Sequence, residues 1–293
     1  HRDLHSFPTR RSSDLPTGYD IPNIRGEGRT VCTNHAWGAA FRGYGSPESE
    51  FGSESLMDEL AEKLGMDPFE LRYKNVYRKG STTPTGQDPE VYSLPEMFDL
   101  MRPKYEAAKK RAAAASGNGL KRGVGVALGV YGAGLDGADS AEADAELMPD
   151  GSVTIYDCWQ DHGQGADMGT LGTAHEALRP LGIGPDRIRL VMNDTRLAPN
   201  TGPAGGSRSQ VVGGQAIINA CEQLIKAMTK PGGGFRTYDE MVQEKLPLRY
   251  NGKWTAPAKD CDADGQGNPF ACYMYGLFLA EVAVDTTTGK TGW

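Results

Sequence analysis

Two glycine-rich segments carry the residues of this chain whose types and spacing could do chemistry. The first is residues 161–169, DHGQGADMG, where Gly163 and Gly165 follow an expected strand and precede an expected helix. The first-turn amides of a helix lack intrahelical acceptors and attract anions. His162 could be a ligand, a base or a capped loop residue, and Gln164 could donate to a ligand near the backbone or face solvent. The segment predicts a loop that binds an anionic group.

The second segment, residues 200–206, NTGPAGG, runs into Ser207, Arg208, Ser209 and Gln210 at the start of a long expected helix. Arg208 offers a planar fork of donors suited to phosphate. Two such loops indicate a ligand with more than one phosphate, although either loop alone could be only a tight turn.

A third glycine loop, residues 39–47, AAFRGYGSP, also leads into an expected helix. Arg42 and Tyr44 flank Gly43 and would offer a charge and an aromatic wall to the same ligand. Taken alone, Tyr44 is expected to be a core residue. The three loops together favour a binding site over three unrelated turns.

Common nucleotide and metal motifs do not account for these loops. Met168 stands where a dinucleotide fingerprint needs its third glycine, and no Gly-Lys-Ser/Thr follows either loop. No second histidine pairs with His162 at metal spacing, and His175 is expected to be a packed or surface residue. The acidic run at residues 260–265 resembles half of an EF-hand, but position 271 lacks the closing glutamate, so we expect a solvated turn.

Composition narrows the classes of partner. The 293 residues suffice for one large or two ordinary domains, and 31 basic against 38 acidic residues give a net charge of -7, which disfavours nucleic acid. No apolar run is long enough to span a membrane. The cysteines are odd in number and scattered, which favours reduced thiols in a cytosol-like compartment. They are Cys32, Cys158, Cys221, Cys261 and Cys272.

Both ends of the sequence look unusual. Residues 1–15, HRDLHSFPTRRSSDL, resemble a translated sequencing adapter, and we expect them to lie outside the fold as an unstructured artefact. At the other end, residues 270–285 form a long strand pattern followed by a turn with only a few residues after it. A strand without its returning partner is an exposed edge, so we expect Trp293 to be a truncation point.

The remaining pattern mixes helices and strands without a regular alternation. Helices are expected at 46–64, 68–76 and 93–115, the last with a capping box formed by Ser93 and Glu96. A face of Leu56, Leu60 and Leu64 is expected on the first of them. Strands at 123–131, 141–148, 152–159 and 187–192 surround a helix at 166–179, and a long helix covers 207–228. We predict an α+β fold of mixed sheets with packed helices.

Taken together, AFRGYGSPE, DHGQGADMGT and TGPAGGSRSQ resemble, in this order, the molybdenum-binding subunit of the xanthine oxidase family. The resemblance is strongest to its bacterial aldehyde oxidoreductases with molybdopterin cytosine dinucleotide, and it runs from about residue 30 to the end. It implies that residues 16–92 are the C-terminal part of the first molybdenum-binding subdomain and residues 93–293 the N-terminal part of the second.

The resemblance also implies roles for single residues. Molybdenum in this family is held by the pterin dithiolene and by oxo, sulfido and hydroxide ligands, so no side chain binds the metal directly. The catalytic positions are Gln164, which would donate to an oxo ligand, and Arg42; Tyr44 would wall the substrate channel. The cofactor-binding positions are Phe41, Arg42, Gly43, His162, Gly163, Gln164, Gly165, Ala166, Asp167, Ser207, Arg208 and Gln210, the last three on the dinucleotide phosphates.

The implied reaction oxidises an aldehyde to a carboxylic acid with oxygen from water. Its general base is a glutamate in a Gly-Val-Gly-Glu segment that this sequence lacks, and its electrons leave through [2Fe-2S] clusters in domains that are also missing, so we expect the fragment alone to be inactive. The implied partners are the aldehyde, the remainder of the protein and a second copy in a cytoplasmic homo-oligomer, with neither nucleic acid nor membrane. Two alternatives stay open: a related hydroxylase of purines or other heteroaromatic rings, and a noncatalytic module that binds nucleotides or anions.

Overall fold

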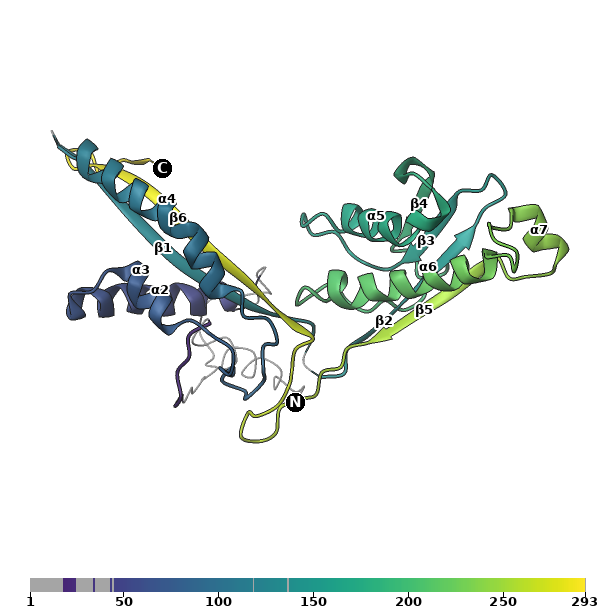
Figure 1. Ribbon diagram of the computed structural model, residues 1–293, viewed down its shortest axis with the longest axis horizontal. Helices are drawn as coiled ribbons and strands as arrows, with labels where there is room; N and C mark the ends of the chain where they lie inside the picture. Colours follow the sequence, from purple (N-terminus) through teal and green to yellow (C-terminus); the bar gives the residue numbers. More distant parts are fainter. Residues whose placement is uncertain are drawn as a thin grey trace. The chain divides into compact units, whose positions relative to one another are not determined.

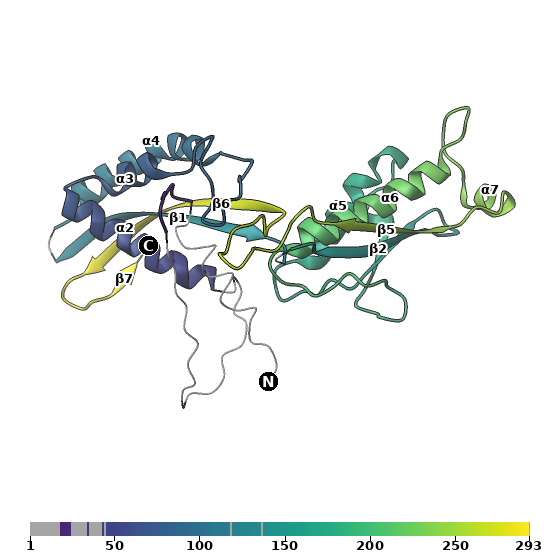
Figure 2. The same ribbon diagram turned by 90° about the horizontal axis from the view of Figure 1, so that it is seen from below.

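The computed structural model describes residues 18–24, 34, 43, 45–117, 119–135 and 137–292. The chain divides into two compact units, which Figures 1 and 2 show from two sides. Unit 1 comprises residues 1–132, 261–268 and 272–293, and unit 2 comprises residues 133–260 and 269–271. The expected artefact at residues 1–15 and the expected truncation point at residue 293 lie outside the described residues.

Unit 2 is built on a four-stranded mixed sheet in the order β4-β3-β2-β5. Strand β2 is antiparallel to both β3 and β5, and β3 is parallel to β4. The strands are β2 (Ser140–Leu147), β3 (Val153–Asp157), β4 (Ile188–Met192) and β5 (Arg249–Thr255). The strands predicted at 141–148 and 152–159 are therefore confirmed as β2 and β3, whereas β5 was not predicted.

Helices α5 and α6 lie side by side on one face of this sheet (Figures 1 and 2). Helix α5 (Ala166–Ala177) connects β3 to β4, and the predicted long helix is a π-helix (Ser209–Gly213) continued by α6 (Gly214–Met228). A short helix not predicted from the sequence, α7 (Tyr238–Gln243), follows with a complete capping box. Helices and strands thus mix as an α+β fold, as predicted.

Small residues let α6 pack closely on the sheet. Alternate residues of β2 that face the helix are buried, and three of them are alanines: Ala141, Ala143 and Ala145. In β5, a Cβ added to Gly252 would lie 2.2 Å from both the Ala216 oxygen and the Ala220 nitrogen of α6. The helix and this strand are therefore so close that only glycine fits at position 252.

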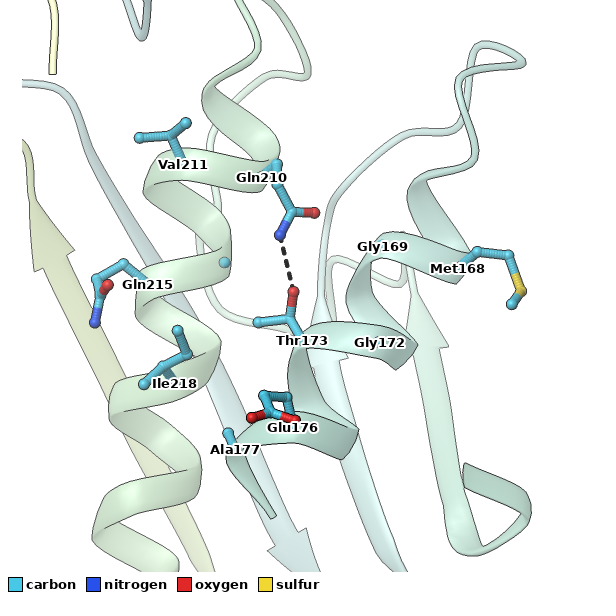
Figure 3. Close-up of a pocket in the computed structure, with 11 residues that line it drawn as sticks. Met168, Gly169, Gly172, Thr173, Glu176, Ala177, Gln210, Val211, Gln215 and Ile218 are labelled. Carbon is cyan, nitrogen blue, oxygen red and sulfur yellow. Dashed lines mark hydrogen bonds between the residues drawn. The ribbon is translucent and has the colours of Figure 1, made fainter. Parts of the chain in front are cut away.

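A groove of about 590 Å³ runs between α5 and the start of the long helix (Figure 3). Gly169 and Gly172 on α5 and Gly214 on α6 leave it open, and Met168 lines one end. Across it, the Gln210 amide donates to the Thr173 hydroxyl at 2.9 Å. The groove separates the first turns of the two helices while this hydrogen bond joins them.

Unit 1 packs three helices with a sheet in the order β1-β6-β7. The elements are α2 (Ser46–Leu64), α3 (Pro68–Asn75), α4 (Leu94–Ala115), β1 (Leu120–Ala133), β6 (Cys272–Asp285) and β7 (Thr291–Gly292). Asp67 caps α3 by accepting from the amides of Phe69 and Glu70, as its position before Pro68 predicts. No described helix of either unit is both long and apolar enough to cross a membrane.

One detail of the helix predictions in unit 1 is wrong, and the buried side of α2 was not predicted. The hydroxyl of Ser93 makes no cap hydrogen bond and instead lies 3.9 Å from the Met97 sulfur, so the expected capping box is absent from this described helix end. On α2 the leucine face is exposed: the exposed fractions of Leu56, Leu60 and Leu64 are 55%, 39% and 62%. The helix instead buries a polar side, and Glu54 lies at its centre.

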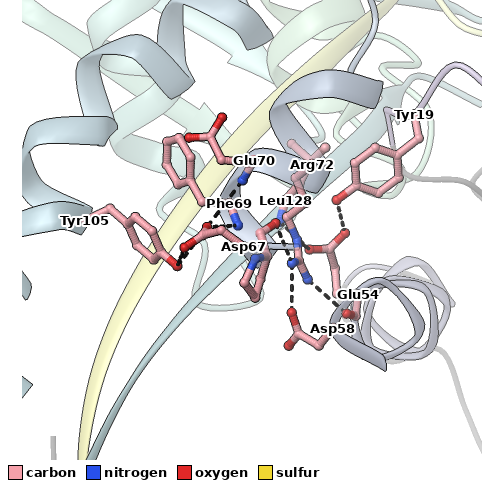
Figure 4. A network of polar contacts seen from close by, with 10 residues as sticks. Tyr19, Glu54, Asp58, Asp67, Phe69, Glu70, Arg72, Tyr105 and Leu128 are labelled. Atoms are coloured by element: carbon pink, nitrogen blue, oxygen red, sulfur yellow. Dashed lines mark hydrogen bonds and ion pairs between the residues drawn. The ribbon is translucent and has the colours of Figure 1, made fainter. Parts of the chain in front are cut away.

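Glu54 joins α2 to the first strand through a buried polar network (Figure 4). One carboxylate oxygen accepts from the Tyr19 hydroxyl at 2.6 Å; the other accepts from Arg72 Nε at 2.7 Å and from the Leu128 amide at 2.9 Å. One helical turn earlier, Glu50 accepts from the Val130 amide at 3.0 Å. Four helical residues rise about 6 Å and two strand residues about 6.6 Å, so the two carboxylates match two successive outward amides of β1.

Candidate anion-binding site

The two glycine loops of unit 2 follow two parallel strands. Residues 158–165 connect β3 to α5, and residues 193–208 connect β4 to the π-helix. Parallel strands place their carboxyl ends at the same edge of a sheet, which is where open mixed sheets of this kind bind ligands. The fold therefore brings together two loops whose motifs are about forty residues apart.

Thr201 ties the two loops to each other and to the sheet. Its buried hydroxyl accepts from the Cys158 amide at 2.9 Å and donates to the Glu142 carbonyl oxygen at 2.9 Å. One side chain thus joins the end of β3, the second loop and β2. The sequence offered no signal for this role.

We expect Thr201→Val to lower the free energy of unfolding by about 2 kcal/mol, because it removes the two part-buried hydrogen bonds of the Thr201 hydroxyl, to the Cys158 amide and to the Glu142 carbonyl oxygen. Thr201→Ser, which keeps the hydroxyl, is the matched control and should cost much less. Urea unfolding of the three chains measures the difference. A larger loss in Thr201→Ser than in Thr201→Val would contradict this, since it would show that the methyl group contributes more than the hydrogen bonds.

Gln160 makes a second link between the loops. Its Oε1 accepts from the Ala204 amide of the second loop at 2.8 Å, and its backbone oxygen accepts from Gln164 Nε2 at 2.8 Å. Gln164 Oε1 in turn accepts from the His162 amide. The predicted catalytic amide is therefore exposed but folded back onto its own loop, which fixes the orientation of that loop.

The first loop already contains an anion of its own. The exposed carboxylate of Asp161 accepts from the Gly163 amide at 2.6 Å and from the Gly165 amide at 3.3 Å. These bonds, the one from Gly163 foremost, hold the pKa of the Asp161 carboxyl below its usual range. This differs from the expectation that these amides point at a ligand, because an acid two residues before a glycine forms its own turn.

The second loop presents amides without such an internal acceptor. For the amides of Gly205, Gly206 and Ser207, the described part of the chain offers no hydrogen-bond acceptor. Gly206 and Ser207 have φ values of 58° and 57°, in the left-handed region that a serine rarely adopts. Successive amides in such a turn, followed by a helix start, form a concave anion-binding surface. Of the two loops, this one fits an anionic ligand better.

Arg208 is not placed as predicted for a phosphate contact. Its guanidinium is buried, with 1% of the residue exposed, and pairs with Asp139. Gln210 is exposed; its amide lies in the groove and donates to Thr173. Ser207 is exposed at the loop surface, as a phosphate contact requires. Of the three predicted phosphate contacts, Arg208 thus contacts protein groups alone, whereas Ser207 and Gln210 are open to a ligand from outside.

A buried acid contacts the start of the first loop and helix α5. The Asp157 carboxylate at the end of β3 is fully buried and accepts from the Trp159 amide at 3.0 Å and from the Thr170 hydroxyl of α5 at 3.1 Å. Burial raises the pKa of Asp157 to about 6. Two residues later, the buried indole Nε1 of Trp159 has no hydrogen-bond partner among the described residues. Buried polar groups of this kind are concentrated at functional sites.

The other predicted site residues have these positions. His162, Gly163, Gly165 and Asp167 are exposed, and Ala166 is buried at the start of α5. Gly43 belongs to unit 1 and has a φ of 104°. Phe41, Arg42 and Tyr44 lie outside the described residues.

The chemistry of the donor set fits an anionic, nonprotein group. Among the described residues, no group of three or more His, Cys, Asp or Glu side chains is arranged to hold a metal ion. Four cysteines are free thiols, Cys158, Cys221, Cys261 and Cys272, and Cys32 lies outside the described residues. The acidic turn near residue 262 is closed by the Asp262 carboxylate, which accepts from the amides of Asp264 and Gln266. The loops thus offer backbone donors to an anionic ligand.

Comparison with known proteins agrees with this reading. Two models described as molybdopterin cofactor-binding domains match residues 4–76 and 100–292. The aldehyde oxidoreductase of Megalodesulfovibrio gigas is 59% identical over 284 residues, which are 96% of this chain and 31% of that protein. The xanthine dehydrogenase/oxidase of Mus musculus is 30% identical over 97% of this chain and 22% of its own length. This chain thus spans about a third or less of these relatives.

Solved structures give the same result. The crystal structure of the aldehyde oxidoreductase from Desulfovibrio desulfuricans superposes with a TM-score of 0.92 at 71% identity, over 97% of this chain and 31% of that chain. Quinoline 2-oxidoreductase from Pseudomonas putida shares the fold, with a TM-score of 0.63 at 18% identity over 83% of this chain and 35% of that chain. The chain therefore belongs to the molybdopterin cofactor-binding domain family and forms part of the molybdenum-binding region of the xanthine oxidase family.

Proposed function

We propose that this chain is part of a molybdenum-dependent oxidoreductase that converts aldehydes to carboxylic acids with oxygen from water, and that its own share is to hold the pterin dinucleotide. The observation that supports this most is the pair of glycine loops at one edge of the unit 2 sheet, joined through Thr201 and Gln160. Identity of 59% to an aldehyde oxidoreductase against 30% to a xanthine dehydrogenase/oxidase favours aldehydes over purines.

In this proposal the two loops share the cofactor. Residues 162–167 line the pterin dinucleotide, with the remaining Gln164 amide hydrogen directed to the metal's oxo ligand, and the amides of Gly205, Gly206 and Ser207 bind its pyrophosphate. Arg42 and Tyr44 keep their proposed places at the metal centre and the substrate channel. When bound, the group supplies a two-electron acceptor and an activated oxygen derived from water.

We further propose the domain division and the partners. Residues 16–92 and 93–293 belong to successive molybdenum-binding subdomains, a boundary supported by the two family matches, which leave residues 77–99 between them. The dinucleotide is the cytosine form. Electrons pass to [2Fe-2S] clusters in another part of the protein, which works as a cytoplasmic homo-oligomer.

Adding a methyl group to Gly165 tests the binding role with a matched control. Gly165 and Gly182 both adopt left-handed φ, 82° and 67°, and an added Cβ meets nothing within 4 Å at either position. Alanine should therefore cost each site a similar backbone strain of about 1 kcal/mol. Gly182 follows α5 and lies away from both loops in sequence.

We expect Gly165→Ala to weaken the binding of cytidine diphosphate by about tenfold, since the new methyl group stands where the ligand approaches the loop, and Gly182→Ala to leave it unchanged. Isothermal titration of the three chains measures the dissociation constants. Equal affinities in all three would remove the ligand-contact role of the first loop. A wild-type chain that binds no cytidine diphosphate would contradict the proposed function itself.

A further inference from the structure

The buried guanidinium of Arg208 has acceptors on every side. Its Nε donates to both Asp139 carboxylate oxygens, at 2.9 and 2.7 Å. Its two terminal nitrogens donate to the carbonyl oxygens of Thr201 at 2.7 Å, Pro203 at 3.0 Å and Ser140 at 2.7 Å. With 1% of Arg208 exposed, these contacts leave its guanidinium no path to a ligand outside the loop.

These contacts determine which way the second loop presents its polar groups. Arg208 draws the carbonyl oxygens of Thr201 and Pro203 inward. The carbonyls of Gly205 and Gly206 are also engaged: Gly205 O accepts from the Arg208 amide at 3.0 Å, and Gly206 O accepts from the Gly134 amide at 2.8 Å. Exposed carbonyl oxygens would repel an anion, so engaging these four favours an anion at the amides from Gly205 to Ser207.

The loop is folded tightly around the guanidinium. A Cβ added to Gly202 would lie 2.8 to 3.0 Å from three guanidinium atoms of Arg208, and Gly202 has a φ of 79°. The Asp139 carboxylate, 5% exposed as a side chain, is itself held by the Leu135 amide at 3.2 Å. Asp139 directly precedes β2, so the ion pair anchors the loop to the sheet.

We propose that Arg208 and Asp139 are positioning residues, which turn the second glycine loop so that its amides from Gly205 to Ser207 receive the ligand's pyrophosphate. This rests on the proposed function for the identity of the ligand. A lysine cannot replace the arginine, because a single ammonium cannot reach acceptors on three sides of a planar fork. Arg208 thus acts on the phosphate through the backbone and not through its own charge.

The sign of the effect of Asp139→Asn separates this role from a direct one. If Arg208 bound phosphate by its charge, removing the nearby negative charge of Asp139 would strengthen or preserve anion binding. If the pair positions the loop, Asp139→Asn frees the guanidinium to shift and the amides lose their orientation. We therefore expect Asp139→Asn and Arg208→Lys each to weaken binding of cytidine diphosphate by about tenfold.

The experiment compares these variants with Leu224→Ala, which creates a cavity in the hydrophobic core where α6 packs, away from the loop. Titrations with cytidine diphosphate and with inorganic pyrophosphate are run well below the melting temperature of each chain, and hydrogen exchange of residues 201–207 is followed without ligand. Leu224→Ala should melt earlier yet keep its dissociation constants within about twofold, whereas both loop variants should lose affinity and exchange faster. If Arg208→Lys does not fold, Asp139→Asn carries the test.

Unchanged or tighter binding by Asp139→Asn would overturn the proposal, as would unchanged exchange of residues 201–207 in both loop variants. Failure of the proposed function looks different. In that case the wild-type chain binds neither probe, while the exchange measurement still reports whether Arg208 and Asp139 hold the loop.

Discussion

Replacing Asp157 by asparagine should stabilise the chain by about 3 kcal/mol near pH 8 and change little near pH 3, because burial raises the pKa of this acid from its usual 3.8 to about 6. The folded-state pKa is raised, so folding favours the protonated acid. The stability associated with it is fully present below pH 3.8, declines as the pH rises toward about 6, and stays low above that. Asparagine keeps the shape and has no charge to bury.

Urea unfolding of wild type and Asp157→Asn across this range measures the effect. Asp167→Asn, a change to an exposed acid of α5, serves as the control and should alter stability by no more than about 0.5 kcal/mol at any pH. A loss of stability in Asp157→Asn near pH 8 would contradict the account, since it would mean that the ionised acid is held by stronger contacts than those from Trp159 and Thr170.

A destabilising acid under the loop is consistent with a binding site. The carboxylate fixes the Trp159 amide at the start of the first loop and the Thr170 hydroxyl on α5. It thereby joins the start of the first loop to α5. Sites that position a ligand often retain groups that cost stability.

The second large effect is expected at the buried network of unit 1. Glu54→Gln should lower the free energy of unfolding by about 3 to 5 kcal/mol, because Arg72, fully buried, loses its buried counterion. The neutral amide also places an NH2 donor where one carboxylate oxygen accepted, either from the Tyr19 hydroxyl or from Arg72 and the Leu128 amide. Asp58, whose side chain is half-exposed, stays paired with Arg72 but does not replace the buried carboxylate of Glu54.

A double variant and an exposed pair provide the controls. Glu54→Leu with Arg72→Met removes both charges and should recover much of the loss, as apolar replacements of buried ion pairs do. Glu59→Gln removes an acid that faces Lys63 on the exposed side of the same helix and should change stability by less than about 0.5 kcal/mol. Thermal unfolding measures the stability of these variants. Equal losses of stability in Glu54→Gln and Glu59→Gln would contradict the expected contribution of the network.

Local signals predicted most of the elements, and the errors have physical causes. Asp67 before Pro68 and glycine after residue 64 mark helix ends by chemistry that acts within a few residues. The buried side of α2 was not predicted, because its leucine spacing gave no hint that a carboxylate network would take the inner face. Strand β5, RYNGKWT, has a polar pattern without the usual alternation of apolar residues, and its place depends on Gly252 meeting α6.

The glycine loops of the site could be predicted from the sequence, but the contacts that hold these loops in place could not. The glycine motifs identify where a ligand approaches, and Asp161 before Gly163 is a turn signal that could have been used. Thr201, Gln160 and Asp139 act on partners 43, 44 and 69 residues away, and mostly on backbone atoms, which no residue pattern encodes. The same reason explains why Arg208 was taken for a ligand contact.

The most direct test of the central claim is the cofactor content of the chain after expression in a host that makes molybdopterin cytosine dinucleotide. Acid hydrolysis of the purified, folded chain releases cytidine monophosphate, which is counted together with molybdenum. We predict close to one of each per chain for wild type and clearly less for Asp139→Asn. A folded wild-type chain that carries neither would contradict the assignment of its glycine loops to the pterin dinucleotide.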